Sequence, residues 1–412
     1  MGGLACRLPL ARQGQAAGQP TQNPLLGQGR VAATQSTRLS PGYWPACLER
    51  SDTMADDVYR ALARRLDEIP NGFPAAPDGS ELRLLASLFQ PEEAALAAQM
   101  RLTPETAAEI AARTGGEVPA VQALLKGMVR RGLIRAERGE GELKFALMPF
   151  VVGIYEMQLG RLDAELAQVF EDYFRYAFVG VLAVQPALHR VIPVEQAVPL
   201  GIEVLPFERA SQYVDEAAAW GVVDCICRTQ QRLLGHGCEA PLDVCLVLST
   251  VANAYDHARG VRALTREGAL DVLRRSEEAG LVHSTSNTKG GVWYICNCCT
   301  CCCAVMRGIS QYGLAQSVAH SAFWTVADEA LCSGCEACLE RCRFGALRVE
   351  EGVARVDHER CLGCGQCSTV CPSEALHLER RPEAAVPDIP ADMQAWLEQR
   401  AADRGIDLGA VQ

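Results

Sequence analysis

Cysteine is the residue type that most restricts what this chain can fold into. The chain has 20 cysteines among its 412 residues, and all but two of them lie between Cys225 and Cys371. Many stand too close in sequence to pair with one another, and disulfide scaffolds are usually small secreted domains. The N-terminal sequence has no hydrophobic signal core. We therefore interpret the cysteines as ligands of metals or clusters in a reducing compartment.

Eight of the cysteines belong to a motif that occurs twice. The first copy has the spacing C-x2-C-x2-C-x3-C and begins at Cys332, and the second begins 29 residues later at Cys361. In each copy an aspartate stands four residues before the first cysteine, and an Ala-Leu pair follows the last. A repeat with this much shared detail indicates one structural unit used twice. The spacing is typical of bacterial ferredoxins with two clusters, in which the fourth cysteine of each run binds the other cluster.

This crossed arrangement predicts two ligand sets. Cluster one is expected to use Cys332, Cys335, Cys338 and Cys371. Cluster two is expected to use Cys361, Cys364, Cys367 and Cys342. Gly334 and Gly363 would let the loop backbone approach the inorganic sulfides closely. Zinc is the alternative for grouped CxxC pairs, but a duplicated run of three CxxC steps favours iron–sulfur clusters.

Residues 325–380 therefore resemble a bacterial-type ferredoxin domain with two [4Fe–4S] clusters, and the resemblance implies transfer of low-potential electrons. One position departs from the family pattern, because Arg343 follows Cys342 where proline is common. Residues 54–380 as a whole also resemble a group of bacterial iron–sulfur proteins that have a winged helix, an upstream Cys-x-Cys-Arg segment and a Cys-Asn-Cys-Cys-x-Cys-Cys-Cys segment. This wider resemblance implies no particular substrate.

Ten further cysteines lie upstream of the ferredoxin motif. The first group contains Cys225, Cys227, Cys238 and Cys245, and the second contains Cys296, Cys298, Cys299, Cys301, Cys302 and Cys303. Residues 222–247 are typical of a strand, a glycine-rich loop and a strand, which would place the first group around one centre as a third cluster or metal site. Six cysteines within eight residues cannot all bind one metal, so the second group could supply further ligands, a second site or buried core residues.

The expected fold class is α+β with several domains, including an N-terminal winged-helix-like unit, a central α/β Cys-rich domain and a C-terminal bacterial-type ferredoxin domain. Residues 1–53 have no acidic residue before Glu49 and are expected to be a disordered or spurious extension, with Met54 as an alternative start. The remaining boundaries are a winged-helix-like domain at 54–150, a long helix and Pro-rich connector at 151–200, the Cys-rich domain at 201–324, the ferredoxin domain at 325–380, and a linker with a terminal helix at 381–412.

The winged-helix-like unit is expected to bind a protein rather than DNA. Residues 81–150 contain nine basic and nine acidic residues, so the unit has no net charge to attract phosphates. The helix that would enter a DNA groove begins at Pro119 and continues with small and apolar residues, which offer little to base edges.

These features favour a cytoplasmic iron–sulfur electron-transfer protein, or the electron-transfer subunit of an oxidoreductase, with two [4Fe–4S] clusters and a further upstream metal site. We expect the ferredoxin to exchange electrons with the upstream cysteines, Arg228 to offset part of their negative charge, and unidentified redox proteins to act as partners. The formal net charge of −11 and the absence of a long apolar run argue against a cationic nucleic-acid coat and a membrane span. Two alternatives stay open, a reductase with chemistry at the upstream site and a redox-sensing regulator. Catalytic residues and oligomeric state are not predicted.

Overall fold

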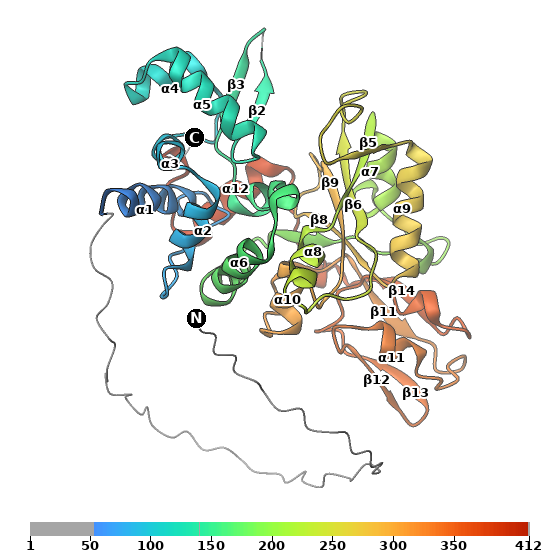
Figure 1. The fold of residues 1–412 in the computed structure, drawn as a ribbon. Helices are drawn as coiled ribbons and strands as arrows, with labels where there is room; N and C mark the ends of the chain where they lie inside the picture. The colour runs from blue at the N-terminus through green and yellow to red at the C-terminus, as the bar shows by residue number, and fades with distance from the viewer. Residues whose placement is uncertain (1–52, 140, 411–412) are drawn as a thin grey trace, which may run out of the picture. The chain divides into compact units, whose positions relative to one another are not determined.

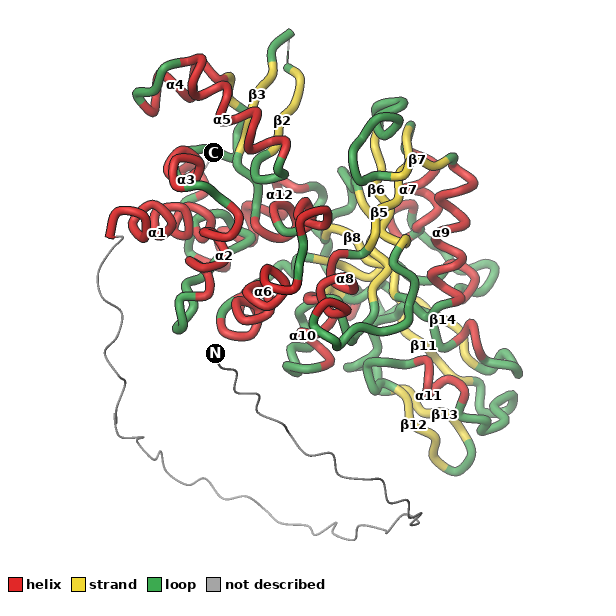
Figure 2. The backbone as a smooth tube through the Cα atoms, in the orientation of Figure 1, coloured by secondary structure: helices red, strands yellow, loops and turns green. Residues whose placement is uncertain are grey.

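The structure, a computed structural model, describes residues 53–139 and 141–410 (Figures 1 and 2). These described residues form one unit. The expectation for residues 1–53 therefore lies outside the described residues, except for Thr53, where helix α1 begins. Across the described ranges, every helix is too short or too polar to span a lipid bilayer.

The N-terminal part consists of short helices followed by a small sheet. Its helices and strands are α1 (Thr53–Asp67), α2 (Ser80–Leu88), α3 (Pro91–Ala97), β1 (Glu105–Thr106), α4 (Ala107–Thr114), α5 (Val118–Arg130), β2 (Arg135–Arg138) and β3 (Leu143–Ala146). The side chain of Thr106 accepts the backbone N–H of Glu109 and caps α4. The apolar face of α5 is buried through Val121, Leu125 and Met128. Strand β3 pairs with both β1 and β2, which makes a small three-stranded sheet.

The long helix that the sequence predicts within residues 151–200 is not continuous in the structure. The segment contains a turn at Phe150–Ile154, a 3-10 helix at Glu156–Arg161, helix α6 (Ala164–Tyr176) and a 3-10 helix at Phe178–Ala183. Leu162 is extended, and the Asp163 carboxylate accepts the N–H of Leu166, so α6 begins with its own cap. The periodic apolar residues are buried as expected, for example Phe170 and Phe174, but against several short elements.

A seven-stranded sheet forms the centre of the Cys-rich region. Its order is β10-β4-β8-β9-β6-β5-β7, and all neighbours are antiparallel except β10 and β4. The strands are β4 (His189–Val191), β5 (Ala219–Asp224), β6 (Asp243–Ser249), β7 (Arg262–Leu264), β8 (Val282–Ser286), β9 (Tyr294–Cys298) and β10 (Val318–Ala319). One face of β5, β6 and β9 presents Val222, Leu246 and Ile295 to the core formed with α7 (Ala210–Glu216) and α9 (Arg266–Glu278). Alternation along each strand leaves the other face to the cysteines.

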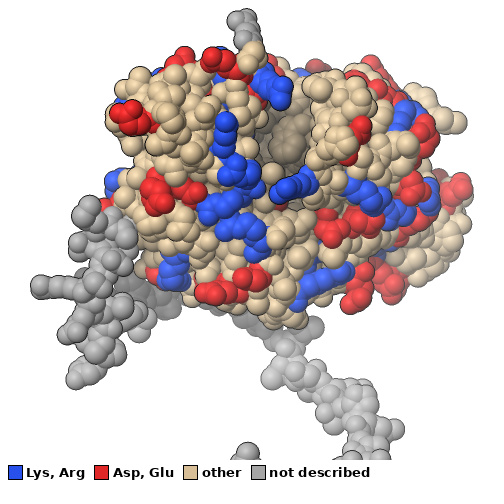
Figure 3. Space-filling view, turned by 45° about the horizontal axis from the view of Figure 1, so that its top comes forward, with Lys and Arg blue, Asp and Glu red and all other residues tan. Residues whose placement is uncertain are grey.

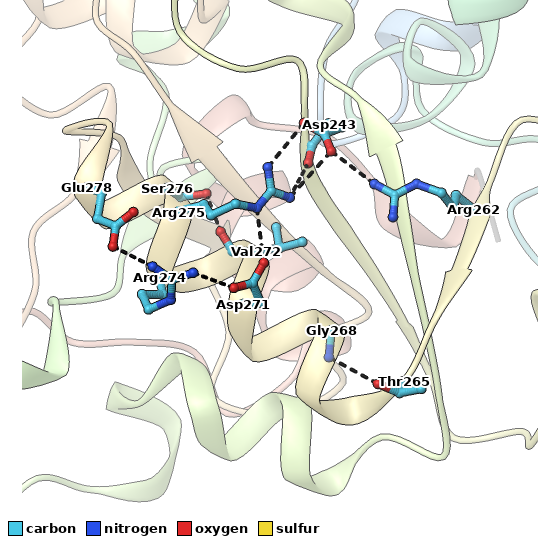
Figure 4. Close-up of polar contacts among 10 residues, drawn as sticks. All are labelled: Asp243, Arg262, Thr265, Gly268, Asp271, Val272, Arg274, Arg275, Ser276 and Glu278. Carbon is cyan, nitrogen blue, oxygen red and sulfur yellow. Dashed lines mark hydrogen bonds and ion pairs between the residues drawn. The ribbon is translucent and has the colours of Figure 1, made fainter.

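Helix α9 has its own N-terminal cap and is followed by strand β8. The Thr265 hydroxyl accepts the N–H of Gly268 at 3.1 Å and caps the helix (Figure 4). Arg275 on α9 and Arg262 on β7 both bind the carboxylate of Asp243 at the start of β6 (Figure 4). These ion pairs connect the helix to the sheet that it covers.

The C-terminal part has the two-fold plan of a duplicated motif. Strand β11 (Phe323–Ala327) pairs with β14 (Leu376–Arg380), and β12 (Leu347–Glu350) pairs with β13 (Val353–Val356), with helix α11 (Ala337–Arg341) between β11 and β12. The chain then continues to α12 (Met393–Arg404). Arg400 on α12 is fully buried and donates to the carbonyls of Pro70 and Val181, so the terminal helix packs against the N-terminal part.

Candidate metal centres

The first ferredoxin quartet joins cysteines from both motif copies. Its four members, Cys332, Cys335, Cys338 and Cys371, line one small pocket. Burial raises the pKa of the Cys338 thiol, and the neighbouring Cys335, Cys371 and Cys332 raise it further. Cys371 of the second motif thus lies with the first motif, as the crossed arrangement requires.

The second quartet shows the same crossing. Burial first, and then Cys367, Cys361 and Cys342, raise the pKa of the Cys364 thiol. Cys342 ends the first motif in sequence, yet its charge acts on the cysteines of the second. The sequence-predicted ligand sets are therefore the sets that the fold brings together.

The surroundings of both quartets suit [4Fe–4S] clusters. The Ala354 N–H points at the Cys332 sulfur and the Thr325 N–H at the Cys361 sulfur, each at 3.4 Å. Such donors stabilise thiolates and tune cluster potentials. Gly334 has φ +67°, and a Cβ there would lie 2.6 Å from the carbonyl oxygen of Gly352. Only glycine fits this loop without strain, which explains its place between the first two cysteines.

The upstream cysteines are arranged differently from the prediction for residues 222–247. Helix α8 (Ile226–Leu233) follows β5 directly, so Cys225 is the N-cap of a helix and Cys227 lies in its first turn. The C-x-C pair at these positions is therefore not on one face of a strand. The structure brings Cys225, Cys227 and Cys245 together but places Cys238 with the second group.

Six upstream thiols lie near enough for each to shift the pKa of two others, and these pairings close into a ring. The order around the ring is Cys225, Cys227, Cys303, Cys298, Cys296, Cys245 and back to Cys225. The pairing of β5 with β6 brings Cys225 near Cys245, because Val223, two residues before Cys225, lies opposite Cys245. Cys296 and Cys298 lie two residues apart on β9 and therefore point to one face. Six thiols are too many for one tetrahedral ion, and their number suits a polynuclear cluster.

The other four upstream thiols, which we call the tight quartet, are Cys238, Cys299, Cys301 and Cys302. All four sulfur atoms lie within 4.8 Å of one another. The Cys238–Cys299 and Cys238–Cys302 distances are 3.8 Å, and the Cys301–Cys302 distance is 3.7 Å. A tetrahedral ion with metal–sulfur bonds of about 2.3 Å separates its sulfurs by about 3.8 Å. A cubane holds each thiolate on a different iron and spreads them further apart, so the tight quartet fits a single ion.

Arg228 lies between the ring and the tight quartet. Its side chain is fully buried and donates to the Asn297 carbonyl at 3.1 Å and to the Cys299 sulfur at 3.8 Å. Burial acts to lower the pKa of Arg228, but Cys225, Cys299 and two further thiols raise it above its ordinary value. Its Nε–H has no partner among the described residues. A buried, unpaired donor is costly, and an anionic cluster would satisfy it.

A cavity of about 550 Å³ joins the upstream cysteines to the second ferredoxin quartet. It is lined by Cys342, Cys361, Cys364 and Cys367 of that quartet, by Cys238, Cys299 and Cys301 of the tight quartet, and by Cys298 of the ring. The division of the upstream cysteines into a ring and a tight quartet was not predicted from the sequence. The alternation Tyr294-Ile295-Cys296-Asn297-Cys298 carried part of the signal, since it marks a strand with two thiols on one face.

The C-terminal cysteines lie in a segment that is similar to known iron–sulfur proteins. Residues 331–375 match the family described as 4Fe-4S dicluster domain. A subunit of an ion-translocating oxidoreductase complex from Methanosarcina acetivorans is 45% identical over 47 residues, which cover 11% of this chain and 18% of the relative. An uncharacterized ferredoxin of Methanocaldococcus jannaschii is 38% identical over 52 residues, covering 12% of this chain and 34% of the relative.

A longer but weaker match extends beyond the domain itself. The uncharacterized ferredoxin-like protein YdhX of Escherichia coli is 29% identical over 108 residues, which cover 24% of this chain and 46% of the relative. The chain thus spans less than half the length of each of these relatives, and no solved structure matches it. The similarity is confined to a part of the chain, and within that part the chain carries a 4Fe-4S dicluster ferredoxin domain.

Proposed function

We propose that this protein transfers electrons between two [4Fe–4S] clusters in its ferredoxin domain and metal centres held by its upstream cysteines. The observation that carries the proposal is the cavity of about 550 Å³, which thiols of the second quartet, the tight quartet and the ring all line. Centres that face one small cavity are close enough to exchange electrons within the chain. An external redox protein would supply or remove the electrons at the other end.

The two cysteine regions are also firmly joined. Arg341 of the ferredoxin domain donates to the carbonyls of Glu277 and Glu278 at the end of α9, at 2.6 and 3.1 Å. Gln366 donates to the Leu281 carbonyl just before β8 at 2.6 Å. Hydrogen bonds from side chains to helix-end carbonyls restrict relative motion. A constant distance between the centres favours a fixed electron path over transient docking.

Within this proposal the six-thiol ring holds a polynuclear iron–sulfur cluster. A chain with Cys225→Ala and Cys227→Ala is expected to lose the iron that exceeds the content of the ferredoxin domain. Full-length protein, purified anaerobically, should hold more than about eight irons, and the double variant should fall to about that number, or to one more if the tight quartet holds iron. The measurements are iron and acid-labile sulfide per chain, with EPR of the reduced protein as a control that the ferredoxin signals persist. If both proteins contain the ferredoxin iron alone, the upstream cluster and the electron path fall together.

The tight quartet holds a single ion, zinc or iron, in this proposal. Cys238→Ser with Cys302→Ser is expected to remove about one metal ion per chain and no acid-labile sulfide. Elemental analysis for both metals, together with sulfide assay, gives the answer. The matched comparison is the Cys225→Ala and Cys227→Ala chain, which should lose sulfide as well. Loss of about four irons with their sulfide from the quartet variant would show a cubane instead.

A further inference from the structure

A second and larger cavity opens beside strands β6 and β9, which carry Cys245 and Cys296 of the ring. It has a volume of about 1400 Å³ and is lined by the end of α5, the turn before α6, strands β5 and β6, and the segment around Tyr294. Figure 3 shows a hollow in this face of the molecule with Lys and Arg side chains along its edge. We call this cavity the arginine cleft. Its volume exceeds that of most small-ligand pockets, so it could hold a molecule of cofactor size.

The sheet connects the floor of the arginine cleft to the thiols. Val247 on β6 and Tyr294 on β9 are register partners, and both line the cleft. Two residues along the same strands, and therefore on the same face, stand Cys245 and Cys296 of the ring. Two residues of strand span about 7 Å. The floor of the cleft is thus one row of side chains from the centre that the ring would hold.

The edge of the cleft carries unbalanced positive charge. Three of its arginines, Arg130, Arg161 and Arg259, have no carboxylate partner among the described residues. Three others are paired, Arg131 with Glu93, Arg135 with Glu137 and Arg262 with Asp243. The lining carboxyls are Asp224, Asp243 and Glu156. Burial, as the main cause, raises the pKa of Glu156 to about 7, so this carboxyl adds less negative charge near neutral pH.

The interior of the cleft combines apolar surface with an unsatisfied amide. Trp293 and Met393 line it and are 47% and 39% exposed. Asn287 also lines it, is 2% exposed, and its side-chain oxygen has no partner among the described residues. A buried polar atom without a partner costs about 1–3 kcal/mol. A bound molecule with a polar group at this depth would remove that cost.

From these observations we infer that the arginine cleft binds an organic anion with an apolar body, the substrate or electron acceptor of the six-thiol centre. The arginines attract and orient the anionic group, and the tryptophan and methionine surface contacts the apolar part. The role of the bound molecule as a redox partner rests on the proposed function. The binding of an organic anion in the cleft does not, because it depends on the arginines and the cavity alone.

The test uses two dyes of nearly the same shape and the purified full-length protein. The anion 8-anilinonaphthalene-1-sulfonate is expected to bind more tightly than neutral N-phenyl-1-naphthylamine, with an affinity that falls as salt rises. Arg130→Gln with Arg259→Gln should weaken the anionic dye about tenfold and leave the neutral dye unchanged. Trp293→Phe should reduce energy transfer from the protein to the bound dye. Titration of dye fluorescence at several salt concentrations measures each affinity.

The control variant carries Arg274→Gln and Arg348→Gln, which remove the same charge outside the cleft. This variant should bind both dyes like the parent chain. Equal affinity for the two dyes, or equal weakening by the control, would overturn the inference. Iron and sulfide are measured on the same samples. Selective anion binding by a chain without upstream iron would therefore support the cleft and contradict the proposed electron path. Upstream iron in a chain that does not select the anion would support the electron path and contradict the cleft.

Discussion

A full-length chain with Cys371→Ser is expected to lose the cluster of the first motif, although Cys371 belongs to the second. The fold places this thiol with Cys332, Cys335 and Cys338, and serine is a poorer iron ligand than cysteine. Iron content should fall by about four per chain, with the corresponding sulfide. Iron and sulfide assays and EPR of the reduced protein measure the loss.

Pairs of substitutions separate crossed from uncrossed ligation. Adding Cys335→Ser to Cys371→Ser should cause no further loss of iron, because both residues serve one cluster. Adding Cys367→Ser instead should remove the ferredoxin iron completely, because Cys367 lies in the other quartet. Uncrossed ligation predicts the reverse outcome for the two pairs. The iron content of the two double variants therefore decides between the ligand sets, and no assignment of either cluster's spectrum is needed.

An Arg307→Met chain is expected to lose about 3–5 kcal/mol of its free energy of unfolding. Arg307 on α10 (Ala304–Ser310) donates to both oxygens of Glu171 on α6, at 2.6 and 2.9 Å. The two side chains are 5% and 2% exposed. Burial acts to raise the pKa of Glu171, but the bonds from Arg307, together with those from Arg175 and Gln231, hold the pKa below its usual value. Methionine would fill the space and leave a buried carboxylate without its main partner.

Urea unfolding followed by circular dichroism under anaerobic conditions measures this cost. The control is Arg274→Met, because Arg274 is 59% exposed and its ion pairs with Asp271 and Glu278 are on the surface. Exposed pairs contribute about 0–1 kcal/mol, so the control should unfold close to the parent midpoint. Equal midpoints for the two variants would mean that the buried pair adds no stability. Since α10 begins next to Cys303, the Arg307 variant should also hold less upstream iron.

The ferredoxin part could be read from the sequence almost residue by residue. The cysteine spacing is short and duplicated, so local sequence specifies both the fold of this part and the grouping of its cysteines. The predicted quartets are the ones that the structure groups. The capped helix at Thr265 and the strand after it were predictable for the same reason, because helix caps and strand alternation depend on neighbouring residues.

The upstream cysteines could not be assigned in this way. Their grouping depends on which strands pair and in which register, as in Val223 opposite Cys245 and Val247 opposite Tyr294. Cys225 is the N-cap of helix α8, so the C-x-C pair lies at the start of a helix and not on a strand. The apolar residues at helical spacing between positions 151 and 180 are likewise largely buried. They do not belong to one continuous helix, because Asp163 caps the start of a new one.

The amino-acid sequence by itself determined the iron–sulfur chemistry, the duplicated ferredoxin motif and the grouping of its eight cysteines, because these depend on spacings of a few residues. Tertiary structure alone decided that the ten upstream thiols divide into a ring and a tight quartet, that Arg228 is buried between them, and that one cavity reaches the ring while a larger one lies beside the strands that carry it. The physical reason is distance along the chain. Groups that are up to about 80 residues apart meet only when non-local strand pairing and core burial fix their positions, and no local pattern encodes that pairing.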